Sequence, residues 1–230
     1  MGERRVLVVA AHPDDEVLGA GGTIASLSDS GAEVRILLLG DGESSRPGIE
    51  AVADKVSARG DCARRAAAVL GATGVTVHAL PDNAFDTVPL LDVVRLVEAE
   101  LTLFPASEIY THHGGDLNID HEVTCRAVIT AARPVDGPGP DLYAFEVRSS
   151  TDWSDPLNAY PFRPNTWRAL GVDAVARKQA ALREYEAEMR PWPHSRSFEA
   201  VDTLLRHRGA QVGVAAAEAF AALRVVHQPG

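Results

Sequence analysis

Short apolar runs of strand length alternate with stretches of helical periodicity, and this alternation constrains the fold more than any other feature of the chain. The first run, VLVVAA at 6–11, is rich in valine and shows no polar alternation, which is typical of a strand buried on both faces. The expected strands are 6–11, 34–39, 75–80, 108–111 and 142–147. The expected helices between them are 18–27, 57–70, 90–104 and 121–132. Strands and helices joined by short links predict a Rossmann-like, three-layer α/β fold with a mostly parallel sheet.

The last third of the chain lacks this alternation. Turns rich in proline and tryptophan fill 149–170, and helices are expected over 174–189, 197–207 and 215–223. Because no repeat or low-complexity segment interrupts the chain, we predict one domain over 1–230 with a helical C-terminal cap. The three tryptophans are expected to be buried anchors beneath long loops; they are Trp153, Trp167 and Trp192.

Charge balance and cysteine content exclude several classes of protein. With 22 Lys and Arg against 32 Asp and Glu, the net charge of −10 argues against nucleic acid as the main partner. Cys62 and Cys125 cannot form a disulfide scaffold and are expected to be buried thiols. The apolar run after Arg5 is too short for a signal core or a membrane span, so we expect a cytoplasmic protein. The expected partner is a small molecule, and a homo-oligomer is left open.

Polar clusters follow two of the expected strands at the points where they end. HPDDE occupies 12–16 after the first strand, and THHGGDLNIDH occupies 111–121 after the strand at 108–111. Ligands of such folds bind at the carboxyl ends of the strands. The two clusters hold half of the eight histidines, namely His12, His112, His113 and His121. Two histidines and a carboxylate around an open position form the ligand set of catalytic zinc sites, which also suits Fe(II). Asp14 and Asp15 are both candidates for the carboxylate.

Glycines at 19, 21 and 22 invite a dinucleotide-binding interpretation, which the surrounding residues oppose. The G-x-G-x-x-G spacing is absent, and three acidic residues at 14–16 stand where pyrophosphate would have to bind. We therefore expect neither a nicotinamide nor a flavin cofactor. Close packing of the first helix on the sheet explains the glycines better.

The sequence AHPDDE at 11–16, together with DLNIDHEVT at 116–124, resembles the LmbE/PIG-L family of zinc-dependent N-deacetylases. The segment 196–220 is also similar to the tail of bacterial members that act on N-acetylated sugars. This resemblance implies that His12, Asp15 and His121 bind the metal and that Asp14 is the general base. It also implies removal of an acetyl group from an amino sugar.

One position departs from the family pattern. Several members carry a histidine where this chain has Asn118, so His113 or His112 becomes the candidate for the cation that polarises the substrate carbonyl. Arg59 matches an arginine that faces the sugar in family members, whereas Arg64 and Arg65 are expected on a solvated helix face. Further candidates for substrate binding are Asp41, Asn118 and Glu146, and 42–54 is expected to be a lid.

Three functional hypotheses follow from these residues. The first is metal-dependent deacetylation of an N-acetylated amino sugar or glycoconjugate, by water that the metal activates. The second uses the same site in a thiol-conjugate amidase or in a deacetylase that tailors a natural product. The third is a metal-free binding module that kept the fold, and the intact residues His12, Asp14, Asp15 and His121 oppose it.

Overall fold

The computed structural model describes residues 4–42, 52–135, 137–155 and 160–227. The strands of its sheet are β1 (Arg5–Ala10), β2 (Glu33–Gly40), β3 (Gly74–Leu80), β4 (Glu108–His112), β5 (Asp141–Phe145), β6 (Thr166–Ala169) and β7 (Ala217–Arg224). The α-helices are α1 (Asp15–Asp29), α2 (Val52–Leu70), α3 (Leu90–Leu103), α4 (Ile119–Ala131), α5 (Val172–Arg183) and α6 (Phe198–Ala210). Short 3₁₀ turns are η2 (Phe85–Thr87), η3 (Thr151–Trp153) and η4 (Glu186–Glu188).

The seven strands form one mixed sheet in the order β3-β2-β1-β4-β5-β7-β6. β1 pairs in parallel with β2 and β4, and β3 and β5 extend the parallel part on either side. The order reverses at β1, whose neighbours come from the two directions of the chain, so the carboxyl ends of β1 and β4 form a switch point where such folds bind ligands. The predicted three-layer α/β fold with a mostly parallel sheet is confirmed.

One element near the end of the chain differs from the prediction. The segment expected as a helix over 215–223 is β7, which pairs antiparallel with β5 and with β6. β6 itself lies in the stretch expected to be irregular. The C-terminal part therefore adds two strands to the sheet as well as the helices α5 and α6.

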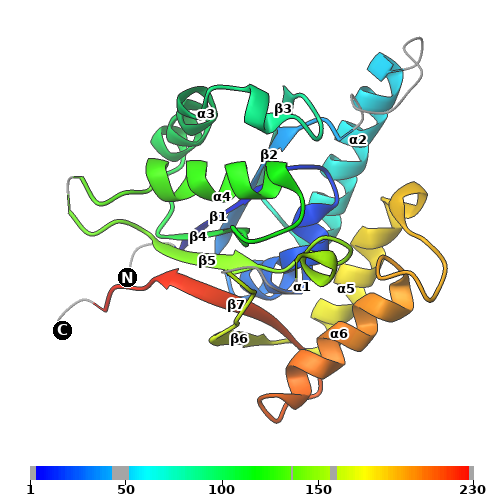
Figure 1. Ribbon diagram of the computed structural model, residues 1–230. Helices are drawn as coiled ribbons and strands as arrows, with labels where there is room; N and C mark the ends of the chain where they lie inside the picture. Colours follow the sequence, from blue (N-terminus) through cyan, green and yellow to red (C-terminus); the bar gives the residue numbers. More distant parts are fainter. Residues whose placement is uncertain (1–3, 43–51, 136, 156–159, 228–230) are drawn as a thin grey trace.

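Alternate side chains of the central strands face opposite layers. Val6 and Val8 belong to one apolar cluster with residues of α1, α2, α5 and α6, whereas Leu7 and Val9 belong to another with residues of α3 and α4. Figure 1 shows α3 and α4 on one side of the sheet and the other helices on the opposite side. All four side chains are fully buried. This explains why the first run reads as continuously apolar, since a strand covered on both faces has no polar side.

α1 approaches the sheet so closely that one of its glycines leaves no room for a side chain. A Cβ added to Gly19 would lie 2.2 Å from Cδ2 of Phe145 at the end of β5. This close packing holds the beginning of α1, and hence the turn before it, against the carboxyl ends of the strands.

All three tryptophans and Cys62 are less buried than expected, with Trp167 half-buried. Trp153 and Trp192 are 52% and 60% exposed, so the prediction of buried anchors is wrong for both. Cys125 is buried and Cys62 is half-buried, and both are free thiols. Within the described residues, no helix has the length and apolarity that a bilayer crossing requires.

Candidate active site

The turn between β1 and α1 carries the first group of site residues. α1 begins at Asp15, and the residue before it, Asp14, has a φ of 118°, a backbone conformation that residues other than glycine rarely adopt. The backbone N–H of Asp14 donates to Oε2 of Glu16 at 2.9 Å, which secures the turn. The carboxylates of Asp15 and Glu16 lie in the first helical turn, where the helix dipole favours negative charge.

His12, Asp15 and His121 bring their donor atoms together at the ends of β1 and β4. Oδ2 of Asp15 lies 3.3 Å from Nδ1 of His12 and 3.2 Å from Nε2 of His121. One ligand atom from each of the three residues lies within 4.8 Å of the others, the spacing of a group that can hold a metal ion. Oδ1 of Asp15 and Nε2 of His121 are buried and make no hydrogen bond. Buried polar atoms are normally satisfied, so this donor set fits a cation.

Carboxylates behind the two histidines fix their rings. Nε2 of His12 contacts Oδ2 of Asp120 at 2.8 Å and Oδ1 of Asp82 at 3.2 Å, and Nδ1 of His121 contacts Oδ2 of Asp116 at 2.8 Å. Asp120 also accepts hydrogen bonds from the backbone of Asn83 at 2.7 Å and Phe85 at 2.9 Å. Carboxylates in this position orient histidines that ligate metals.

The carboxylates favour positive charge at this place. Burial alone lowers the pKa of His12, but Asp120 and Asp15 outweigh it and raise the pKa to about 10. Burial is likewise overcome at His121, where Asp15 and Asp116 raise the pKa to about 9. The surrounding carboxylates thus favour positive charge at the two histidines, which a metal ion or protons can supply.

His112 and His113, the other two histidines of the segment 111–121, lie outside the cavity that is described in the next paragraph. Nε2 of His112 accepts from the backbone N–H of Ala11 at 2.8 Å, and the ring stacks on His121 at a centroid distance of 3.8 Å. Burial and the neighbouring His121 hold the pKa of His112 well below its usual value, so the ring is neutral. Nε2 of His113 contacts the carbonyl oxygen of Tyr160 at 2.8 Å.

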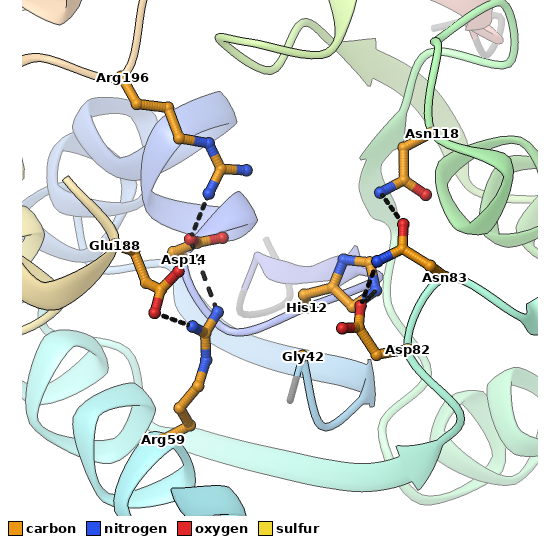
Figure 2. Close-up of a pocket in the computed structure, with 9 residues that line it drawn as sticks. All are labelled: His12, Asp14, Gly42, Arg59, Asp82, Asn83, Asn118, Glu188 and Arg196. Carbon is orange, nitrogen blue, oxygen red and sulfur yellow. Dashed lines mark hydrogen bonds and ion pairs between the residues drawn. The ribbon is translucent and has the colours of Figure 1, made fainter. Parts of the chain in front are cut away.

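A cavity of about 170 Å³ opens beside His12 and Asp14 (Figure 2). Apart from Gly42, all of its lining residues are polar or charged. They are His12, Asp14, Gly42, Arg59, Asp82, Asn83, Asn118, Glu188 and Arg196. A cavity lined in this way suits a small molecule with many hydrogen-bonding groups.

Two arginines flank Asp14 on one side of the cavity. Nη1 of Arg196 lies 3.0 Å from Oδ2 of Asp14, and Nη2 of Arg59 lies 3.7 Å from the same oxygen. Arg59 also pairs with Oε1 of Glu188 at 2.5 Å and donates to the carbonyl oxygen of Pro13 at 2.8 Å. Burial raises the pKa of Asp14 against the opposing effect of Arg196.

Asn118 lies across the cavity from the arginines (Figure 2). It caps α4, accepting at its side-chain oxygen from the backbone of Asp120 at 2.8 Å, while its amide donates to Oδ1 of Asn83 at 3.4 Å. Asp41 is buried just beyond the end of β2 and is not one of the lining residues. Glu146 lies outside the cavity, where Arg208 binds both of its oxygens at 2.7 and 2.6 Å.

Among the remaining predictions, Arg64 and Arg65 are exposed on α2 as expected. Most of the predicted lid lies outside the described residues, which omit 43–51.

Sequence reasoning assigned no role to four of the lining residues, although it placed the loop 82–88 among those expected to set substrate specificity. Asp82 and Asn83 follow β3, and the rule that polar residues at strand ends form sites could have found them. Glu188 and Arg196 follow no strand of the parallel sheet; they lie in the segment between α5 and α6. The resemblance of 196–220 to the family tail includes Arg196 but assigns it no role, and no motif signals Glu188. Their place at the cavity depends on how the C-terminal segment folds back over the sheet.

The family model of PIG-L, described as GlcNAc-PI de-N-acetylase, matches residues 7–132. Among curated proteins, the "Uncharacterized deacetylase YaiS" of Escherichia coli K12 is 26% identical over 190 residues, which cover 79% of this chain and 90% of that protein. The diacetylchitobiose deacetylase of Thermococcus kodakarensis is 38% identical over 78 residues, 34% of this chain and 28% of that protein.

Solved structures share the fold over nearly the whole chain. The N,N'-diacetylchitobiose deacetylase of Pyrococcus horikoshii matches with a TM-score of 0.76 at 20% identity, covering 95% of this chain and 83% of that one. The 4-carboxy-2-hydroxymuconate hydratase GalB of Pseudomonas putida matches with a TM-score of 0.80 at 22% identity, covering 99% and 100%. Since deacetylases and a hydratase share this fold, the fold alone does not select the reaction.

Proposed function

Because this chain belongs to the PIG-L family of de-N-acetylases, we propose that it hydrolyses the acetamido group of an N-acetylated amino sugar or glycoconjugate with one bound divalent metal ion. The observation that carries the proposal is the buried group of His12, Asp15 and His121. Two of its donor atoms make no hydrogen bond, and it lies beside a polar cavity. Curated relatives named as sugar deacetylases agree with this reaction class.

His12, Asp15 and His121 would hold the ion, and their donor set suits Zn²⁺ or Fe²⁺. Such an ion supplies Lewis acidity, which polarises a carbonyl and makes water a stronger acid. Asp116 and Asp120 contribute by fixing the ring orientation of His121 and His12.

We assign the general base to Asp14. Its carboxylate lines the cavity next to the proposed metal group, yet it belongs to none of the three groups of side chains that could hold an ion among the described residues. Arg196 and Arg59 hold Oδ2 of Asp14 from two sides, which fixes the direction in which the carboxylate accepts a proton. A base placed in this way takes the proton of the attacking water and passes it to the leaving nitrogen.

The cavity supports a polar sugar as substrate. Asn83 and Asn118 face Arg59, Glu188 and Arg196 (Figure 2) across a polar volume of about 170 Å³, which is small enough to select one residue of a larger molecule. Asp41 stays a candidate for hydroxyl binding at the same end of the sheet. Glu146 and His113 are left out, because their polar atoms contact Arg208 and Tyr160 outside the cavity.

The reaction is tested by acetate release. The purified protein, loaded with zinc or with iron(II), is offered N-acetylated sugars, nucleotide sugars, glycosylated thiols and acylated natural products. We expect acetate and a free amine in equal amounts from one of these classes. Turnover of a thiol conjugate or a natural product alone would favour an amidase or a tailoring deacetylase, and no turnover with any of them would contradict the proposal.

Metal content tests the site separately from turnover. His121→Ala removes one proposed ligand and should lower the bound metal well below one ion per chain by elemental analysis. His207→Ala removes an exposed histidine of α6 and serves as the control that keeps full metal content. Full occupancy in His121→Ala would refute the assignment. Wild-type protein that binds no metal after reconstitution would favour the binding module.

A further inference from the structure

The hydrolysis proposed above creates a negative charge for which the described cavity offers few partners. As water attacks an acyl carbon, the carbonyl oxygen gains charge and needs a cation or hydrogen-bond donor nearby. Among the described lining residues, the arginines are Arg59 and Arg196, and no lysine is present. Nε2 of His112 and Nε2 of His113 contact Ala11 and Tyr160, and neither residue lines the cavity, so neither ring is placed for this purpose.

Arg59 is occupied in holding the architecture of the cavity wall. Its Nη1 pairs with Glu188 at 2.5 Å, and its Nη2 donates to the carbonyl oxygen of Pro13 at 2.8 Å. The same side chain is only 10% exposed. These contacts tie α2 to the turn that carries Asp14, so Arg59 acts as a structural clamp.

Arg196 is held as firmly but keeps part of its guanidinium group available. Nε donates to Oγ of Ser149 at 2.7 Å, and Nη1 donates to Oδ2 of Asp14 at 3.0 Å. Its Nη2 has no hydrogen-bond partner among the residues that the structure describes. Figure 2 shows this second terminal nitrogen directed away from Asp14, toward the open space that Asn118 faces from the other side.

The surroundings of Arg196 are built to keep that position. Its backbone N–H donates to Nδ1 of His194 at 3.0 Å, and Ser149, which accepts from Nε, has a positive φ of 69°. Asp14 and Asn83 are the other non-glycine residues with positive φ in the described chain, and both line the cavity. Backbone conformations of this kind persist where the surrounding structure fixes them, and they cluster at functional sites.

We propose that Arg196 is the catalytic cation of this site, donating from Nη2 to the oxygen that becomes negative during attack on the acyl group. The assignment rests on the proposed function. The water oxygen forms a bond to the acyl carbon while the carbonyl electron pair moves onto its oxygen, and Asp14 accepts the water proton. When this electron pair returns from the oxygen to re-form the carbonyl bond, the carbon–nitrogen bond breaks and Asp14 gives its proton to the nitrogen. The products are the amine and acetic acid, which ionises.

Kinetics of Arg196→Met measure this role. Removal of one donor to the developing negative charge should lower kcat by about 10²–10³-fold with a KM close to the wild-type value. Metal content should match the wild type. Guanidinium chloride should restore part of the turnover of Arg196→Ala. Unchanged kcat, a change in KM alone, or loss of metal in parallel with activity would overturn the assignment.

Arg148→Met is the matched control. Arg148 is a cation on the same pair of loops, contacting the carbonyl oxygen of Ser195 at 3.2 Å and Asp152 at 3.3 Å, but it does not line the cavity. Its loss should leave kcat near the wild-type value. A decrease as large as that of Arg196→Met would show that loop structure, and not the cation, is responsible, and would contradict the proposal.

Binding of methylphosphonate separates this inference from the proposed function. This tetrahedral anion has the shape and charge of the attacked acetyl group, and calorimetry measures its affinity without any turnover. Arg196→Met in zinc-loaded protein should bind it about 10- to 100-fold more weakly than the wild type, the effect of one hydrogen bond between charged groups. Equal affinity would refute the role of Arg196 even in an active enzyme. A wild type without acetate release but with Arg196-dependent binding would refute only the deacetylation.

Discussion

Asp14 combines a strained backbone with a buried charge. Its φ of 118° is costly for a residue with a Cβ, by about 1–3 kcal/mol, and its side chain is only 3% exposed. The conformation turns the chain sharply between β1 and α1, so that Asp14 faces the cavity while Asp15 faces the histidines. Two adjacent carboxylates thereby reach different partners, which is what a separate base and ligand require.

The separation predicts the behaviour of Asp14→Asn. The variant keeps the size of the side chain but cannot accept a proton, so turnover should fall by about 10²–10⁴-fold. Metal affinity should stay near that of the wild type, because Asp14 contributes no ligand. Acetate release and elemental analysis of the same preparation check both points. Weak metal binding, with activity restored by excess zinc, would make Asp14 a ligand and refute the mechanism.

Site residues next to strand ends could be found from the sequence, whereas those in the segment between α5 and α6 could not. His12, Asp15 and His121 follow or adjoin the ends of β1 and β4, so the topology of a parallel sheet is enough to bring them together. Arg196 reaches Asp14 across 182 positions of the chain. That contact depends on the path of the segment between α5 and α6, which has no periodic pattern to read.

At the scale of elements, the contact between α1 and β5 sets how closely the turn between β1 and α1, which carries Asp14, approaches the sheet. A Cβ at Gly19 would lie 2.2 Å from Phe145, which is fully buried and cannot move aside freely. Gly19→Ala should therefore lower the free energy of unfolding by about 1–3 kcal/mol through overpacking. Urea denaturation measures the change.

Gly60→Ala in α2 is the matched control for this prediction. A Cβ there would meet nothing closer than 3.6 Å, at Nη2 of the flexible Arg64 side chain. Helix propensity should then make the protein more stable by up to about 1 kcal/mol. Equal effects of the two substitutions would show that close packing at Gly19 is not what excludes a side chain.

Helix propensity misled the prediction for 215–223. Alanine-rich sequence with glutamate favours a helix, yet these residues form β7 between β5 and β6. Phe220 pairs with Phe145 of β5 and is fully buried, and Ala219 is only 3% exposed. Small side chains at this place allow α1 and α6 to pack over the strand. Tertiary pairing thus outweighs a local preference that is worth only tenths of a kcal/mol per residue.

At the scale of the whole molecule, one buried ion pair joins the C-terminal elements to the first helix. Nζ of Lys178 in α5 donates to Oε1 of Glu218 in β7 at 2.6 Å and to the carbonyl oxygen of Leu18 in α1 at 2.7 Å. Glu218 accepts in addition from the backbone of Gly22 and Thr23 at 2.9 and 2.7 Å. Every charge of the pair is satisfied in a place that excludes water, so removal of one partner leaves the other buried and unpaired.

This junction leads us to expect that the chain unfolds in one cooperative transition, as the single domain predicted from the sequence would. Far-UV circular dichroism reports the whole sheet, whereas tryptophan fluorescence reports residues 153, 167 and 192 of the C-terminal part, so the two signals should share one urea midpoint.

Lys178→Met should lower the free energy of unfolding by about 3–5 kcal/mol and shift both midpoints together, at one fixed zinc concentration. Exposed Arg206→Met, whose partner Asp202 is 38% exposed, should shift neither. Fluorescence that changes at lower urea than the dichroism would instead mean that the C-terminal part unfolds as a unit of its own, and that the site loses Arg196 before it loses its metal ligands.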